Sequence, residues 1–115
     1  MIYKPFSVVV VPFPFTESAN IKKRPAIVLS SEEFQKASKH ISLLMITSAK
    51  HSTWLGDNEI INLKEAGLNT PSIMRQKIFT LDNRLILNGI GKLSLKDKQS
   101  LIKSFQWQFK QLEIN

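Results

Sequence analysis

The hydrophobic positions of this chain fall into short runs separated by turn residues, with one longer periodic segment at the end. Val8–Val11 is β-branched throughout, which predicts a strand buried on both faces. Pro12 and Pro14 interrupt the run, so residues 12–23 are predicted to form a loop. Residues 24–30 begin the next apolar run and predict a second strand.

The middle of the chain repeats this alternation of apolar runs and turns. Ser31, followed by two glutamates, marks a short helix start. Four further strands are predicted at 40–48, 59–63, 72–82 and within 85–94, with turn chemistry at 51–58 and 64–71 between them.

The C-terminal segment changes to a helical period. From Leu95 onward the apolar positions are Leu101, Ile102, Phe105, Phe109 and Leu112. Ser94 stands where an N-cap belongs, and Asp97 favours the first turn through the helix dipole. About six short strands and a terminal helix predict a mainly β domain with a C-terminal helix (α+β), a small and strongly bent sheet or barrel spanning residues 1–115.

Composition narrows the class of partner. Sixteen Lys and Arg against nine Asp and Glu leave a net charge of +7, which favours an anionic partner, with nucleic acid ahead of a membrane surface. The absence of cysteine excludes disulfides and thiolate metal sites and suits a reducing cytoplasm. The apolar stretch near the N-terminus is too short to span a bilayer and lacks a signal-peptide pattern, so we expect a cytoplasmic protein without a membrane segment.

Several kinds of chemistry find no support in the residues. His40 and His51 are the only histidines, and neither stands in a metal-binding spacing, so we expect no metal and no cofactor. His40, at a strand start, is interpreted as structural. No phosphate-binding loop, serine-nucleophile elbow or dinucleotide fingerprint occurs. Taken singly, Arg24 is interpretable as a solvated cation and Thr47 as an ordinary strand residue.

The order of the apolar segments carries more information than any one of them. "VVVVPFPFT", "KKRPAIVLS", "ITS", "PSIMRQKIFTLD" and "IGKLS" follow one another from Val8 to Leu95. This series resembles the MazF/PemK family of toxins from type II toxin–antitoxin modules. The resemblance implies a small SH3-like barrel of the CcdB/PemK type, paired as a homodimer, that cleaves single-stranded RNA at short sequences without a metal.

The resemblance also assigns site residues. The family's catalytic arginine stands in an Arg-Pro dipeptide, which here is Arg24-Pro25, and its threonine ends the third strand, which here is Thr47. Both residue types suit the chemistry, because arginine offers a planar fork of donors to phosphate oxygens and threonine a hydroxyl from a stiff position. The RNA-binding candidates are Phe15, Lys23, Ser48, Lys50, His51, Ser72 and Gln76.

These candidates have different expected roles. Phe15 could stack a base, whereas Phe13 is expected to be a core residue. Ser72 and Gln76 share one face of a regular strand and could read base edges. Lys50 and His51 could hold backbone phosphates, and a solvated loop explains them equally well. Trp54 is expected at the surface, and Trp107 lies off the apolar stripe of the terminal helix.

The remaining expectations concern partners and alternatives. An antitoxin with an acidic tail is expected to bind near Arg24 and Lys50. Where the family usually has Gly-Asp, this chain has Phe6-Ser7, which predicts an altered loop shape. The alternative functions are a non-catalytic, CcdB-like gyrase poison and an SH3-like barrel that binds RNA without cutting it; the Arg-Pro and Ile-Thr-Ser elements favour the nuclease.

Overall fold

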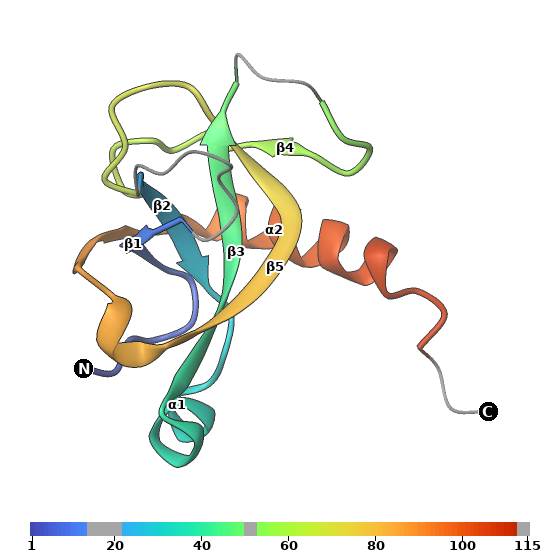
Figure 1. Ribbon diagram of the computed structural model, residues 1–115. Coiled ribbons are helices and arrows are strands. Elements are labelled where there is room, and N and C mark those ends of the chain that lie inside the picture. The colour runs from blue at the N-terminus through green and yellow to red at the C-terminus, as the bar shows by residue number, and fades with distance from the viewer. Residues whose placement is uncertain (14–21, 50–52, 113–115) are drawn as a thin grey trace.

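A computed structural model describes residues 1–13, 22–49 and 53–112. Their elements, in chain order, are β1 (Ser7–Pro12), β2 (Lys23–Val28), α1 (Glu32–Ser38), β3 (His40–Ser48), β4 (Asn58–Glu59), β5 (Ser72–Asp82), a 3-10 turn (Asn83–Leu85), β6 (Asn88–Lys92) and α2 (Leu95–Gln108). The strands form one antiparallel sheet in the order β4-β5-β3-β2-β1-β6. The sheet curls into a half-barrel with α2 packed against it (Figure 1). The predicted mainly β fold with a C-terminal helix is therefore confirmed.

Apolar side chains are buried on both faces of the curled sheet, because neighbouring strand residues project to opposite sides. The helix-side core contains Val8, Ile27, Leu44, Ile46, Met74, Leu93 and Leu101. The second core contains Val9, Val11, Phe13, Ala26, Val28, Ile41, Leu43, Met45 and Phe79. This two-sided burial explains why the first three strands are apolar almost without pause.

The helices begin where the predicted caps stand. The Ser31 side chain accepts a hydrogen bond from the Phe34 backbone N–H at 3.0 Å, and Ser94 caps the first turn of α2 by accepting from the Asp97 N–H. Each cap satisfies a backbone donor that the first turn would otherwise leave unpaired. Of the predicted apolar stripe of α2, Leu101 lies in the helix-side core, whereas Ile102 is 43% exposed and Leu112 lies beyond the end of the helix and is 79% exposed.

Phe6 occupies the turn before β1 in an unusual backbone conformation. Its φ is +71°, in the left-handed region that glycine adopts most readily. Its backbone is fixed on both sides, by a hydrogen bond to the Val28 carbonyl and one from the Leu93 N–H. The Lys98 Nζ lies 5.3 Å from the centre of the Phe6 ring. These contacts therefore hold a non-glycine residue in a backbone conformation that glycine adopts most readily.

Three predicted boundaries were wrong. Strand β1 includes Pro12, which pairs with Lys23. Proline is tolerated at this position because the pairing there does not require a backbone N–H from residue 12. Strand β2 accordingly begins at Lys23 and ends before Leu29. The strand predicted at 59–63 is only the two-residue β4. The Ile60 N–H still donates to the Ser72 carbonyl of β5, but the N–H groups of Ile61 and Asn62 bind a carboxylate on α2 rather than a neighbouring strand.

The helices in the described part of the chain are too short or too polar to cross a membrane.

Candidate functional site

Arg24 and Thr47 lie opposite each other at one end of the sheet. Arg24 is the second residue of β2, and Thr47 is the second-last residue of β3. The two strands are antiparallel, with Ala26 paired to Met45. Continuing this register by two residues puts Arg24 across from Thr47 on one face. This end of the two strands lies away from α1, as Figure 1 shows.

An aromatic ring supports the Arg24 side chain. The Arg24 Cζ lies 5.5 Å from the centre of the Phe13 ring. Phe13 is buried, as predicted, and packs edge-to-face on Phe79 with the ring centres 6.0 Å apart. A cation beside an aromatic ring gains electrostatic attraction, so Phe13 restrains the position of the guanidinium. The sequence predicted the burial of Phe13 but not this contact.

Arg24 also carries a donor that nothing in the described chain satisfies. Its Nε is buried without a hydrogen-bond partner. Neither ion pair found among the described residues includes Arg24. Buried donors in folded proteins are nearly always satisfied, so an exception needs an explanation. An anion held beside Arg24 would supply the missing acceptor.

A pocket of about 450 Å³ opens at this end of the sheet. Its polar and charged lining residues are Lys23, Arg24, Thr47, Ser48, Asn69, Thr70 and Ser72. The apolar part comes from β1, β2, β3, β6 and the segment before β5. Among the described residues that line it there is no carboxylate. Two cations without an acidic side chain give the pocket a positive field, which favours an anionic ligand.

The structure brings five of the nine predicted site residues to this pocket: Arg24, Thr47, Lys23, Ser48 and Ser72. Ser48 pairs with Ser72 across β3 and β5, and the Ser72 hydroxyl donates to the Thr70 carbonyl at 2.9 Å. Because adjacent strand residues face opposite sides, the two serines project from the face opposite to Thr47. The predicted residues therefore meet at one end of the sheet but from two faces.

Among the predicted site residues that the structure describes, Gln76 does not line this pocket. Gln76 is 8% exposed, and neither its Oε1 nor its Nε2 has a hydrogen-bond partner. It lies where the register between β3 and β5 shifts, so its side chain is not placed by regular alternation from Ser72. Phe15, Lys50 and His51 lie outside the described residues.

Residues 67–70, the segment before β5, form one wall of the pocket, and the sequence analysis did not assign them a role. Gly67 has φ +75°, and a Cβ there would overlap the Ile90 carbonyl. Glycine is therefore required at this close approach between the wall and β6. Asn69 and Thr70 add polar groups to the pocket, and only the turn character of the segment marked them in the sequence.

The wall is tied to α2 through a buried carboxylate. Asp97 is fully buried and accepts hydrogen bonds from the backbone N–H groups of Ile61 at 2.9 Å and Asn62 at 3.0 Å. The chain then turns back, with the Leu68 N–H donating to the Leu63 carbonyl at 2.9 Å. The sequence predicted Asp97 only as a favourable first-turn charge. Through these contacts α2 holds residues 61 and 62, which precede the turn that leads to the pocket wall.

A buried ion pair fixes the segment before β4. Arg75 Nη2 lies 2.9 Å from Asp57 Oδ2, and both side chains are less than a tenth exposed. The Trp54 ring centre lies 5.0 Å from the Arg75 Cζ. Burial raises the pKa of Asp57, but hydrogen bonds from Arg75 and from the Trp54 N–H, with the Arg75 charge, hold that pKa below its ordinary value. Trp54 remains 45% exposed, as predicted for a surface aromatic.

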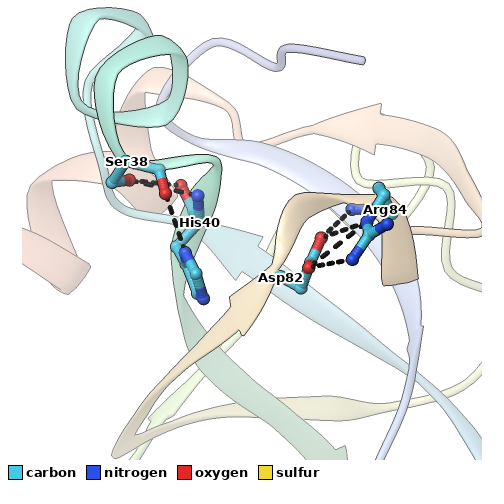
Figure 2. Close-up of polar contacts among 4 residues, drawn as sticks. All are labelled: Ser38, His40, Asp82 and Arg84. Atoms are coloured by element: carbon cyan, nitrogen blue, oxygen red, sulfur yellow. Dashed lines mark hydrogen bonds and ion pairs between the residues drawn. The ribbon is translucent and has the colours of Figure 1, made fainter.

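The opposite end of the sheet holds a separate polar cluster (Figure 2). His40 Nδ1 lies 2.9 Å from the Ser38 carbonyl oxygen, and Arg84 Nη2 lies 2.8 Å from Asp82 Oδ2. Hydrogen bonds from the Arg84 side chain and backbone lower the pKa of Asp82 to about 2. These contacts join residues close in sequence at the ends of α1 and β5. His40 thus lies away from Arg24 and Thr47, in a turn-stabilising role.

Solved structures of toxins share this fold. An endoribonuclease in complex with its cognate antitoxin, from a mycobacterial species, superposes with a TM-score of 0.74 at 10% identity, covering 98% of this chain and 99% of that one. The MazF-mt6 toxin of Mycobacterium tuberculosis gives 0.71 at 17% identity, with 90% and 96% covered. MazF from Deinococcus radiodurans gives 0.73 at 12% identity, with 96% and 98% covered. At these identities the likeness concerns the fold.

The sequence itself decides the family. None of the curated protein sequences compared with this chain matches it. A family model described as "PemK-like, MazF-like toxin of type II toxin-antitoxin system", however, matches residues 4–109. That range includes every strand, both helices and the paired positions of Arg24 and Thr47. The chain therefore belongs to the PemK-like, MazF-like toxins of type II toxin–antitoxin systems.

Proposed function

We propose that this toxin is a sequence-specific endoribonuclease that cleaves single-stranded RNA without a metal ion, with Arg24 and Thr47 as its catalytic pair. The observation that carries the proposal is the Arg24 side chain. It is held on Phe13 across from Thr47, with a buried and unpaired Nε, at a pocket that no described carboxylate lines. Family members solved as structures are named endoribonucleases, which supports the same activity.

The chemistry needs few groups, because RNA carries its own nucleophile. The 2′-oxygen attacks the adjacent phosphorus, the bond from phosphorus to the 5′-oxygen breaks, and the products carry a 2′,3′-cyclic phosphate and a 5′-OH. Negative charge builds on the phosphoryl oxygens during this step, and fixed donors that face it lower the barrier. Arg24 offers a planar fork of N–H donors to these oxygens, so its role is to stabilise charge. Thr47 supplies a hydroxyl donor from a buried, β-branched position.

The pocket residues around the pair have supporting roles in the proposal. Lys23 is exposed at the start of β2 and is suited to hold a backbone phosphate, which positions RNA without reading sequence. Ser48 and Ser72 offer hydroxyl groups at the pocket, where base edges could be read. Gln76 supplies a further amide whose hydrogen bonds are unmade in the described chain.

RNA cleavage by purified protein in EDTA tests the proposal. Arg24→Ala should reduce the cleavage rate by about 10²–10³-fold, the usual cost of losing one electrostatic donor. Arg24→Lys should retain only part of the activity, because lysine keeps the charge but loses the fork. The matched control is Arg84→Ala, which removes an exposed arginine at the far end of the sheet. Uncut RNA at enzyme excess, or products with 5′-phosphate ends, would contradict the proposal.

We also propose that the active form is a homodimer that is silenced by an antitoxin with an acidic tail. Solved relatives include an endoribonuclease with its cognate antitoxin and a MazE–MazF complex from Deinococcus radiodurans. The net charge of +7 favours an acidic partner. Because no described carboxylate lines the pocket, acidic side chains of the tail can bind where the RNA phosphates would bind. Binding of the acidic tail, measured directly, should weaken in Arg24→Ala; equal binding by wild type and variant would place the tail elsewhere.

A further inference from the structure

A second cation lies beside the ring that supports Arg24. The Lys77 Nζ is 6.0 Å from the centre of the Phe13 ring, and the Arg24 Cζ is 5.5 Å from the same point. The two charges are therefore separated by no more than the sum of these distances. They come from β2 and β5, which are separated in the sheet by β3.

Lys77 lies on the same side of the sheet as Arg24. The register between β3 and β5 shifts beside Lys77, so strand alternation does not place its side chain. Its nearness to the Phe13 ring does, because Phe13 and Phe79 both belong to the second core and meet edge-to-face. Arg24 lies on that side as well, because Ala26 does.

Two like charges beside one ring repel each other. Lys77 is half-buried, so solvent screens its charge only in part. The Phe13 ring offsets some of the cost, since its face attracts cations. A bound anion would offset more, because it interacts with both charges at once and can accept the hydrogen bond that Arg24 Nε lacks.

We propose that Lys77 is a second phosphate-binding cation of this site and that, with Arg24 and the Phe13 ring, it holds a phosphate of the RNA backbone. The proposal rests on the proposed ribonuclease function and names a residue that the sequence analysis did not select. Lysine presents a point charge rather than a planar fork, so Lys77 should strengthen binding of all sequences alike. Sequence preference should come from other residues.

The test measures binding of a single-stranded RNA whose riboses are 2′-O-methylated, which removes the nucleophile and so separates binding from cleavage. Lys77→Met keeps the apolar stem and removes the charge, and Lys77→Arg keeps the charge. The matched control is Lys36→Met, which removes an exposed charge from α1 at the other end of the sheet. Fluorescence anisotropy at several salt concentrations gives both the affinity and its dependence on salt.

Lys77→Met should weaken binding about three- to tenfold. It should lower the slope of log K against log salt by about 0.7, the value for one phosphate contact on a single strand. Lys77→Arg should restore both quantities, and Lys36→Met should change neither. If Lys77→Met keeps the wild-type affinity and slope, or if Lys77→Met and Lys77→Arg lose equally, the role proposed for Lys77 is wrong. Neither outcome bears on the proposed ribonuclease function. Wild-type protein that binds no RNA would overturn the proposed function and this inference together.

Discussion

Replacing Asp97 with alanine should destabilise the protein by releasing residues 61 and 62 from α2, and not only by weakening α2 itself. The carboxylate is fully buried and accepts two backbone hydrogen bonds, from Ile61 and Asn62, at 2.9 and 3.0 Å. Ser94 Oγ also lies 3.2 Å from it, but that hydroxyl has one hydrogen and lies closer, at 2.6 Å, to Asn62 Oδ1. Asp97→Ala therefore removes at least two hydrogen bonds to a buried carboxylate.

The size of the effect follows from those two donors. Both hydrogen bonds are part-buried, and each N–H left without an acceptor costs about 1–3 kcal/mol. Loss of the first-turn charge adds about 0.5 kcal/mol. We expect Asp97→Ala to lower the free energy of unfolding by about 3–5 kcal/mol, a large part of the total for a domain of this size. At about 4 °C per kcal/mol, the melting temperature should fall by roughly 12–20 °C.

Urea unfolding followed by circular dichroism measures this change, and hydrogen exchange at Ile61 and Asn62 localises it. Glu33→Ala is the matched control, because Glu33 is an exposed acid in the first turn of α1. It should change stability by no more than about 0.5 kcal/mol. A loss in Asp97→Ala below about 1 kcal/mol, or unchanged exchange at the two amides, would refute the anchoring role of the carboxylate.

Two further predictions concern the site and its surroundings. Thr47→Val keeps the shape and removes the hydroxyl, so the cleavage rate should fall about 10²-fold with little change in melting temperature; a rate within threefold of wild type would count against Thr47. The pKa of Asp57 is below its ordinary value of 3.8 in the folded protein, so its pairing with Arg75 stabilises the fold above that pH and is lost as pH falls through the folded value. Asp57→Asn should therefore be less stable than wild type at pH 7, and urea unfolding should show the difference shrinking by pH 3; a constant difference would contradict this linkage.

Elements whose causes are local were predictable from the sequence. The extents of β3 and β5 agree with their apolar runs, and α2 begins at its predicted cap, Ser94. Strand propensity, alternation and capping depend on neighbouring residues only, so the sequence contains all the information that they require. The pairing of Arg24 with Thr47 could be anticipated only from the family resemblance, since neither residue type is distinctive alone.

The tertiary structure alone decided what depends on contacts between distant segments. Strand β4 is short because Asp97, 35 residues away from Asn62, accepts the hydrogen bonds of the Ile61 and Asn62 N–H groups. Lys77 on β5 comes close to the Phe13 ring, which also supports Arg24 on β2. Strand β3 lies between these two strands, and the curl of the sheet brings their side chains together. Such contacts follow from register and curvature, which arise when whole strands pair and bury both faces. The residues next to a given position in the sequence therefore do not predict these contacts.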